Sequence, residues 1–344
     1  MERSGPEKLT GGRRRLRAAG VSLLSLLCLA LVSSPAPAAE PLKVRVGYGT
    51  PPSDITPLLF EKPALLTYYG KTYTIEFSHF RGTSPQIQAL AGKGIDLGTL
   101  SYTSLAFGIE RAGLEVKAVA ALNRDGQPGY FSITWGVLED SPVRSVADLR
   151  GKVISTNVIG GGLDIPIRVI MRKHGMEDKR DYRIIEVEFP NNEAMLRERK
   201  VDAAVFLIPF WAKARQAGGI RPLFTAADAV GTNEMIMKVA RTEWLRQNPE
   251  LARQFFSDWV KAWKWFIDPK NRDEALEITA RFTKAPVGRY KGWAFSKQDL
   301  YRDPDALPSL EVLQRNFDLL KEWGYTKTRL NAADYVDTSF AKPR

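Results

Sequence analysis

The chain has 344 residues and a formal net charge of +11, from 50 lysines and arginines against 39 aspartates and glutamates. The first 39 residues hold six of the basic residues and two of the acids, so the rest of the chain carries about +7. There, basic and acidic residues are interspersed, as in Arg197-Glu198-Arg199-Lys200, which is typical of a solvated surface rather than a nucleic-acid-binding stripe. We therefore expect no nucleic-acid partner.

Few side chains of the kind that bind metals or act as nucleophiles are present. The only cysteine, Cys28, lies within the first 39 residues, and the only histidines are His79 and His174. Disulfides, thiolate metal sites and multi-histidine metal sites are therefore not expected beyond residue 39. We predict no metal, no cofactor and no catalytic residues.

Residues 1–39 are predicted to be a secretory signal peptide. A basic stretch from Arg13 to Arg17 precedes an apolar run over 18–32, which is too short to span a membrane comfortably. Small residues follow at Ala36-Pro37-Ala38, so cleavage is expected near Ala38 or Ala39. A retained anchor helix is the alternative, and a weak twin-arginine pattern leaves the export route open.

Strands alternate with short helices over much of the remaining chain, which predicts an α/β fold with parallel sheets and right-handed crossovers. The expected strands are Val44–Tyr48, Tyr73–Phe80, Ile95–Thr99, Val116–Leu122, Phe131–Val137, Lys152–Thr156, Arg183–Glu188, Val201–Leu207 and Glu234–Val239. The expected helices are Gln86–Ala91, a helix beginning at 101–104, Ile165–His174, Glu193–Glu198, Pro209–Ala217, Asn248–Ile267, Arg272–Phe282 and Pro308–Glu322.

The length beyond the leader exceeds what one hydrophobic core usually supports, so two lobes are expected. Residues 40–129 and 231–344 are predicted to form lobe I, and residues 130–230 to form lobe II. The helix over 248–267 carries aromatic residues on a wide face between Phe255 and Phe266. Core packing is the favoured interpretation of that face, and an aromatic ligand site is the alternative.

The stretch from Asp140 to Gly162 is the most informative part of the chain. Ser145 can cap a one-turn helix that Gly151 ends, and a strand then leads into Gly160-Gly161-Gly162. The segment Asp140-Ser-Pro-Val-Arg-Ser-Val-Ala-Asp-Leu-Arg-Gly-Lys152 resembles a motif of the solute-binding proteins that serve ABC importers of nitrate, sulfonates, taurine and thiamine-type pyrimidines. Ile95-Asp96-Leu97-Gly98 and Lys200-Val201-Asp202-Ala203 are similar to two further strands of that family, although a glycine is usual in place of Lys200.

The resemblance covers roughly residues 42–266 and implies a type II periplasmic-binding-protein fold, a two-lobed clamshell with a mainly parallel sheet in each lobe. It implies a monomeric periplasmic protein, not an enzyme, that delivers a solute to the transmembrane subunits of an ABC permease. The solute would be small, organic and anionic, or of an aromatic pyrimidine type.

Two alternatives remain open. One is an enzyme on the same fold, similar to pyrimidine- or menaquinone-pathway enzymes, although no Cys/His cluster, Ser-His-Asp set or GxSxG motif is evident. The other is a sensor module that presents the same ligand to a receptor.

Ligands of such folds collect at the carboxyl ends of strands, where helix N-termini with hydroxyl or glycine residues supply donors. Arg81 would suit a carboxylate or sulfonate, and Phe210-Trp211 match an aromatic pair of the family. Ser84 as a simple cap and the glycines as a flexible loop are the alternatives. The predicted ligand-binding residues are Ser53, Arg81, Thr83, Ser84, Tyr102, Thr103, Tyr130, Asn157, Gly160, Gly161, Gly162, Phe210 and Trp211.

Overall fold

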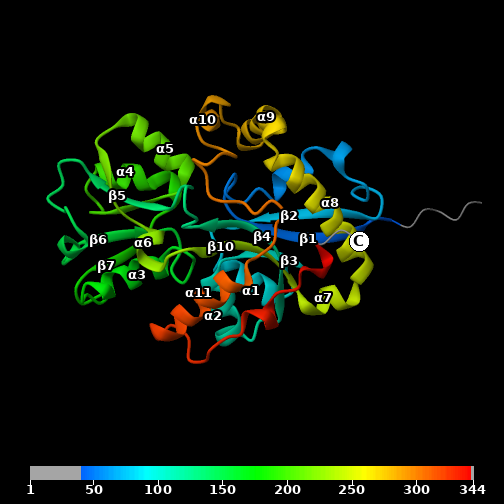
Figure 1. The fold of residues 1–344 in the computed structure, drawn as a ribbon, viewed down its shortest axis with the longest axis horizontal. Coiled ribbons are helices and arrows are strands. Elements are labelled where there is room, and N and C mark those ends of the chain that lie inside the picture. Colours follow the sequence, from blue (N-terminus) through cyan, green and yellow to red (C-terminus); the bar gives the residue numbers. More distant parts are fainter. Residues whose placement is uncertain (1–39, 342–344) are drawn as a thin grey trace, which may run out of the picture. The chain divides into compact units, whose positions relative to one another are not determined.

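A five-stranded sheet with strand order β2-β1-β3-β10-β4 organises the computed structural model (Figure 1). Its strands are β1 (Leu42–Tyr48), β2 (Tyr73–His79), β3 (Leu97–Leu100), β4 (Val116–Asp125) and β10 (Asn233–Arg241). β1 pairs in parallel with β2 and β3, whereas β10 runs antiparallel to both β3 and β4. The structure describes residues 40–341, so the predicted signal peptide and Cys28 lie outside the described residues.

The middle of the chain forms two smaller sheets. β5 (Thr134–Leu138) lies between β8 (Ala204–Phe206) and β9 (Ile220–Thr225), antiparallel to both, and β6 (Val153–Thr156) pairs in parallel with β7 (Arg183–Glu186). A parallel bridge between Ile154 and Ala203 joins these two sheets. The α/β prediction is confirmed, but the sheets are not mainly parallel: the five-stranded sheet is mixed, the sheet of β8, β5 and β9 is antiparallel, and β6 and β7 are parallel.

Helices cover these sheets. They are α1 (Pro85–Ala91), α2 (Tyr102–Ala112), α3 (Asp164–Lys173), α4 (Asn192–Arg197), α5 (Ile208–Ala217), α6 (Ala226–Val230), α7 (Thr242–Gln247), α8 (Pro249–Ile267), α9 (Arg272–Thr283), α10 (Gly288–Lys291) and α11 (Leu310–Glu322). α11 packs on β10 and α2, and α8 lies beside the C-terminal segment (Figure 1). None of the helices within residues 40–341 is long and apolar enough to cross a membrane.

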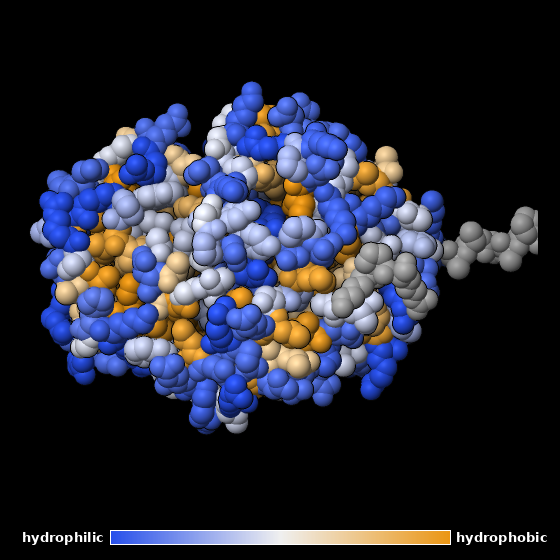
Figure 2. All heavy atoms as spheres, in the orientation of Figure 1, coloured by the Kyte–Doolittle hydropathy of each residue, from blue (hydrophilic) through white to orange (hydrophobic). Residues whose placement is uncertain are grey.

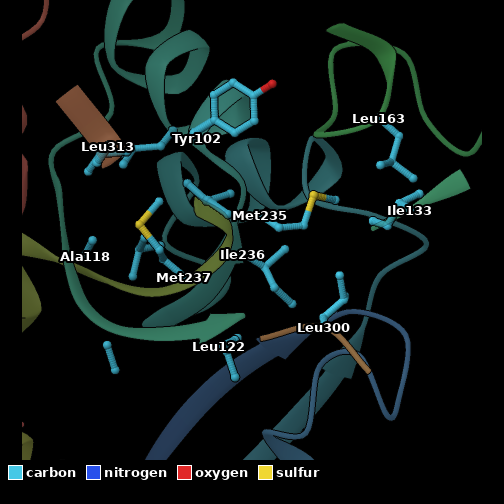
Figure 3. Packing of buried hydrophobic residues seen from close by; sticks show 14 of the residues in the cluster. Tyr102, Ala118, Leu122, Ile133, Leu163, Met235, Ile236, Met237, Leu300 and Leu313 are labelled. Carbon is cyan, nitrogen blue, oxygen red and sulfur yellow. The ribbon is translucent and has the colours of Figure 1, made fainter. Parts of the chain in front are cut away.

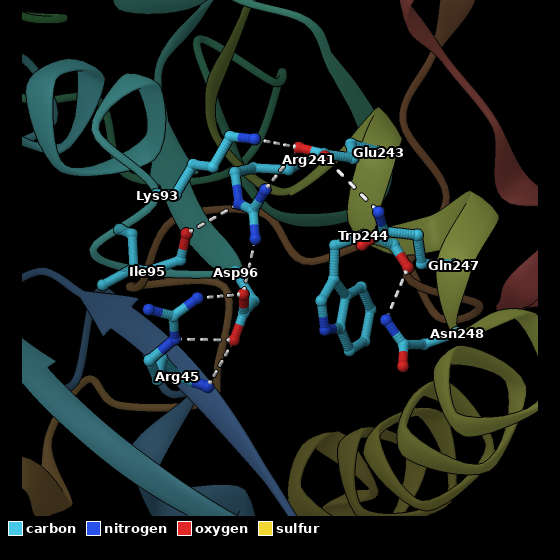
Figure 4. Close-up of polar contacts among 9 residues, drawn as sticks. All are labelled: Arg45, Lys93, Ile95, Asp96, Arg241, Glu243, Trp244, Gln247 and Asn248. Atoms are coloured by element: carbon cyan, nitrogen blue, oxygen red, sulfur yellow. Dashed lines mark hydrogen bonds and ion pairs between the residues drawn. The ribbon is translucent and has the colours of Figure 1, made fainter.

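The motif Ile95-Asp96-Leu97-Gly98 has a structural role that is visible in its contacts. The carboxylate of Asp96 accepts hydrogen bonds from the Arg45 backbone N–H and Nε, both at 3.0 Å, and from Arg241 Nη2 at 2.8 Å (Figure 4). Burial raises the pKa of Asp96, but the hydrogen bonds from the two arginines outweigh it and hold that pKa below its usual value. Asp96 thus ties the start of β3 to β1 and to the end of β10.

The aromatic face of α8 lies in the hydrophobic core. Phe255, Trp259, Trp263 and Phe266 are fully buried, and the Phe255 ring stacks on Phe60 with centroids 5.6 Å apart. This confirms the core interpretation of that face. On the side of the molecule drawn in Figure 2, hydrophilic residues surround smaller hydrophobic patches, as the interspersed charges predicted.

Candidate functional site

A cavity of about 60 Å³ lies where both sets of strands contribute loops, several times the roughly 10–15 Å³ that one water molecule requires. Its walls come from the loops after β1, β2, β6 and β8, from the interior of β3, β4 and β10, and from the segment before α11. The lining residues are Gly49, Thr50, Ser53, Asp54, Arg81, Gly82, Thr83, Thr99, Asn123, Ile133, Asn157, Gly162, Leu163, Phe189, Leu207, Met235, Ile236 and Leu300.

One side of the cavity is apolar. Met235 and Ile236 reach it from β10, Ile133 from the residue before β5, Leu163 from the residue before α3, and Leu300 from the segment between α10 and α11 (Figure 3). These residues are buried, and they come from parts of the chain separated by more than a hundred positions. The apolar wall therefore exists only in the folded chain.

A polar part of the lining is built around the buried carboxylate of Asp54. Its Oδ1 accepts the Thr56 N–H at 3.0 Å, and its Oδ2 accepts the Gly49 N–H at 2.9 Å and the Thr99 hydroxyl at 2.7 Å. The Thr99 oxygen in turn accepts a hydrogen bond from Lys238 Nζ at 2.7 Å. Thr99 thus links a carboxylate that lines the cavity to an ammonium group behind it.

The charges of Asp54 and Lys238 each shift the pKa of the other. Burial raises the pKa of Asp54, but the Lys238 charge and the hydrogen bonds from Gly49, Thr56 and Thr99 outweigh it, so the net pKa is below its usual value. Burial lowers the pKa of Lys238 to about 8, and the Asp54 charge opposes that change. At neutral pH the cavity therefore faces an ionised carboxylate.

Three further lining residues each have a buried polar atom without a partner within residues 40–341. Ser53 Oγ, Asn123 Oδ1 and Asn157 Oδ1 are buried and have no hydrogen-bond partner within residues 40–341. The amide nitrogens of the two asparagines are used elsewhere, since Asn123 Nδ2 donates to the Ser53 carbonyl at 2.8 Å and Asn157 Nδ2 to the Arg81 carbonyl at 3.3 Å. Their oxygens are therefore left without a donor within residues 40–341.

The loop after β2 and the glycine loop after β6 meet at the edge of the cavity. Arg81 Nη1 forms an ion pair with Glu188 Oε1 at 2.9 Å, and both side chains are mostly exposed. At Gly162, an added Cβ would lie 2.9 Å from Met235 Cε and 3.0 Å from Ser101 Cβ. The loop therefore packs so closely that a larger residue here would require the flexible end of the Met235 side chain to shift.

The structure brings some of the predicted ligand-binding residues into the cavity lining, namely Ser53, Arg81, Thr83, Asn157 and Gly162. Ser84, Gly160 and Gly161 are not among the lining residues but lie close together: a Cβ added at Gly160 or Gly161 would be 3.7 or 3.5 Å from the Ser84 hydroxyl. The Ser84 side chain makes no capping hydrogen bond to α1.

Five of the predicted residues lie elsewhere. Tyr102 and Thr103 are fully buried in the first turn of α2, where the Thr103 hydroxyl is 2.8 Å from Ser101 Oγ. Tyr130 packs edge-on against Tyr301. Phe210 stacks on Phe189, which itself lines the cavity, and Trp211 packs on Phe206 in a small core cluster.

Sequence reasoning missed Asp54, Thr99 and Asn123. Thr99 and Asn123 lie inside strands: Thr99 is a single polar residue in Leu-Gly-Thr-Leu, and Asn123 follows the apolar run Ala-Ala-Leu within a strand that continues to Asp125. Such an interruption at a buried strand position was the available signal, because buried polar groups normally have a partner.

These features define a class of protein. The fold is that of the alkanesulfonate-binding protein SsuA from Xanthomonas axonopodis pv. citri bound to MOPS, with a TM-score of 0.67, 20% identity, and coverage of 87% of this chain and 99% of that one. The periplasmic nitrate-binding protein NrtA from Synechocystis PCC 6803 also shares it, with a TM-score of 0.65, 16% identity, and coverage of 85% and 84%. The desulfurization enzyme DszB is similar as well, with a TM-score of 0.59, 16% identity, and coverage of 87% and 97%.

Residues 37–280 match the model of the NMT1-like family, and the chain belongs to this family. No curated protein sequence matches it. The resemblance to solute-binding proteins predicted from the Asp140–Lys152 motif is thereby confirmed.

Proposed function

We propose that this chain is the substrate-binding component of an ABC importer, exported to the periplasm by its first 39 residues. It captures a small organic solute in the cavity and delivers it to the transmembrane subunits of a permease. The observation that carries the proposal is a cavity built jointly by residues of 40–129 and 231–344 and by residues of 130–230, the proposed lobes I and II.

The connections between the proposed lobes are compatible with opening. The chain passes between them after β4, at residues 126–133, and again before β10, at residues 231–232. At the cavity edge, the contacts between the proposed lobes include an exposed ion pair, Arg81 with Glu188, and a long hydrogen bond from Asn157. These two contacts contribute little stability, whereas Ile208 of α5 packs in a buried cluster with Leu276 and Trp293, which an opening motion must keep or separate.

The lining chemistry supports binding rather than catalysis. The described lining residues offer hydroxyls, amides, one carboxylate and one guanidinium, and none of them is a histidine or a cysteine. Asp54 is occupied by Gly49, Thr56 and Thr99, so it is held in place rather than poised beside a nucleophile. Because DszB shares the fold, an enzyme on this scaffold remains the competing hypothesis.

Isothermal titration calorimetry of the purified protein tests the proposal. The solutes are ethanesulfonate, taurine, nitrate and 4-aminopyrimidine, and each mixture is also analysed by mass spectrometry after overnight incubation. We expect saturable binding of one solute class with the solute recovered unchanged. Chemical conversion of the solute would favour the enzyme, and no saturable binding in the whole set would contradict the proposal.

A further inference from the structure

The unpartnered polar atoms of the lining residues are mainly hydrogen-bond acceptors. An asparagine amide oxygen can only accept, and Asn123 and Asn157 both direct their nitrogens to carbonyls elsewhere. This assignment of the amide ends is required, since turning either amide over would place its oxygen against the carbonyl oxygen of Ser53 or Arg81. The two unpartnered oxygens therefore call for donors on the ligand.

Asp54 adds a negative charge to the same wall. Its three hydrogen bonds use three of the about four acceptor positions that a carboxylate offers, which leaves one free. Its countercharge, Lys238, is not among the lining residues and is used by Thr99 and by the Gly47 carbonyl, at 2.7 and 3.0 Å. Of these two charged residues, only Asp54 lines the cavity that a solute would enter.

A bare oxyanion fits this wall poorly. Like charges repel most strongly where water is scarce, and an oxyanion supplies no proton to Asn123 or Asp54. Among the described lining residues, Arg81 is the single basic side chain, and it is 68% exposed and paired with Glu188. An acidic group could therefore be recognised only at the Arg81 edge.

We infer that the solute carries an N–H group, an ammonium, amidine or amino-heterocycle nitrogen, that binds at Ser53, Asp54 and Asn123. Any acidic group of the same molecule lies toward Arg81. This inference rests on the proposed binding function and names its substrate class: amino-bearing solutes, zwitterions included, in place of simple nitrate or alkanesulfonate.

Matched solute pairs that differ by one amino group test the inference by calorimetry. The pairs are taurine with ethanesulfonate, β-alanine with propionate, and 4-aminopyrimidine with pyrimidine, and nitrate is titrated alone. We expect at least one amino-bearing member to bind at least about tenfold more tightly than its partner, because buried acceptors that lack a donor are costly. Equal affinity within every pair that binds, or binding of nitrate alone, would overturn the inference and leave the proposed function standing. No binding in the whole set would count against both.

Two variants locate the nitrogen. Ser53→Ala removes the unpartnered hydroxyl of a lining residue, and Thr326→Val is the matched control, because the Thr326 hydroxyl is also buried and unpartnered within residues 40–341 and Thr326 does not line the cavity. We expect Ser53→Ala to weaken binding of the amino-bearing member by about fivefold and that of its partner by less, as for one lost hydrogen bond. If Ser53→Ala weakens both members equally, or no more than Thr326→Val does, the nitrogen does not bind there.

Discussion

Replacing Asp54 with asparagine should greatly lower the free energy of unfolding, because the buried ammonium group of Lys238 loses its countercharge. Asp54 and Lys238 are 1% and 0% exposed, and the Thr99 hydroxyl joins them. The asparagine would keep the side-chain size but lose the charge that offsets the Lys238 ammonium. It would also present an amide nitrogen to some of the donors that Asp54 now accepts.

The magnitude follows from what remains buried. Removal of one partner of a buried charge pair typically costs about 3–5 kcal/mol. Here Lys238 keeps its hydrogen bonds to Gly47 and Thr99 and can lose its proton, since its pKa is already about 8. We therefore expect the lower end, about 3 kcal/mol at pH 7, and a coupling energy of about 2 kcal/mol with Lys238→Met in a double-mutant cycle.

Urea unfolding of the wild type, both single variants and the double variant measures this coupling. Asp140→Asn is the control, because Asp140 is an exposed carboxylate paired with Arg199, and its loss should change the free energy of unfolding by at most about 0.5 kcal/mol. If the two single effects add to within about 0.5 kcal/mol, the charges of Asp54 and Lys238 do not stabilise each other and the account of this wall is wrong.

Three further predictions concern the same region. Burial raises the pKa of Asp125 to about 6, so the folded state binds the extra proton, and its contribution to stability is full below about pH 4 and is lost as the pH rises through 6. Asp125→Asn should remove this dependence, while its amide loses one of the two acceptor oxygens that the Ser132 hydroxyl and the Ile133 N–H now use; an unchanged pH profile of urea unfolding would refute the prediction. Gly162→Ala should displace Met235 and weaken solute binding in calorimetry, at a cost of about 1–3 kcal/mol in stability, whereas unaltered affinity would show that the loop tolerates the methyl group. Arg81→Ala should leave the melting temperature nearly unchanged because its pair with Glu188 is exposed, yet weaken binding of a solute with an acidic group; equal affinity would place that group elsewhere.

The sequence by itself determined the local elements and the family. Turn residues and caps locate strand and helix ends through interactions within a few positions, as where the Asp148 carboxylate accepts the Ser145 N–H and hydroxyl at 2.8 and 2.9 Å. The aromatic spacing of α8 predicted a buried face for the same reason, because helical periodicity is a local property. β9 was missed since Pro222 weakens its strand pattern, and a proline is tolerated there because β9 is an edge strand.

Only the tertiary structure decided which of the candidate side chains line the cavity, and which further ones join them. Tyr102 and Thr103 begin a helix after a strand, as predicted, but the packing of α2 turns them into the core. β10 returns between β3 and β4, and this sheet contributes Thr99 and Asn123 to the cavity lining. The segment before α11 contributes Leu300. Strand order and helix rotation depend on contacts between distant residues, and local sequence patterns do not encode them.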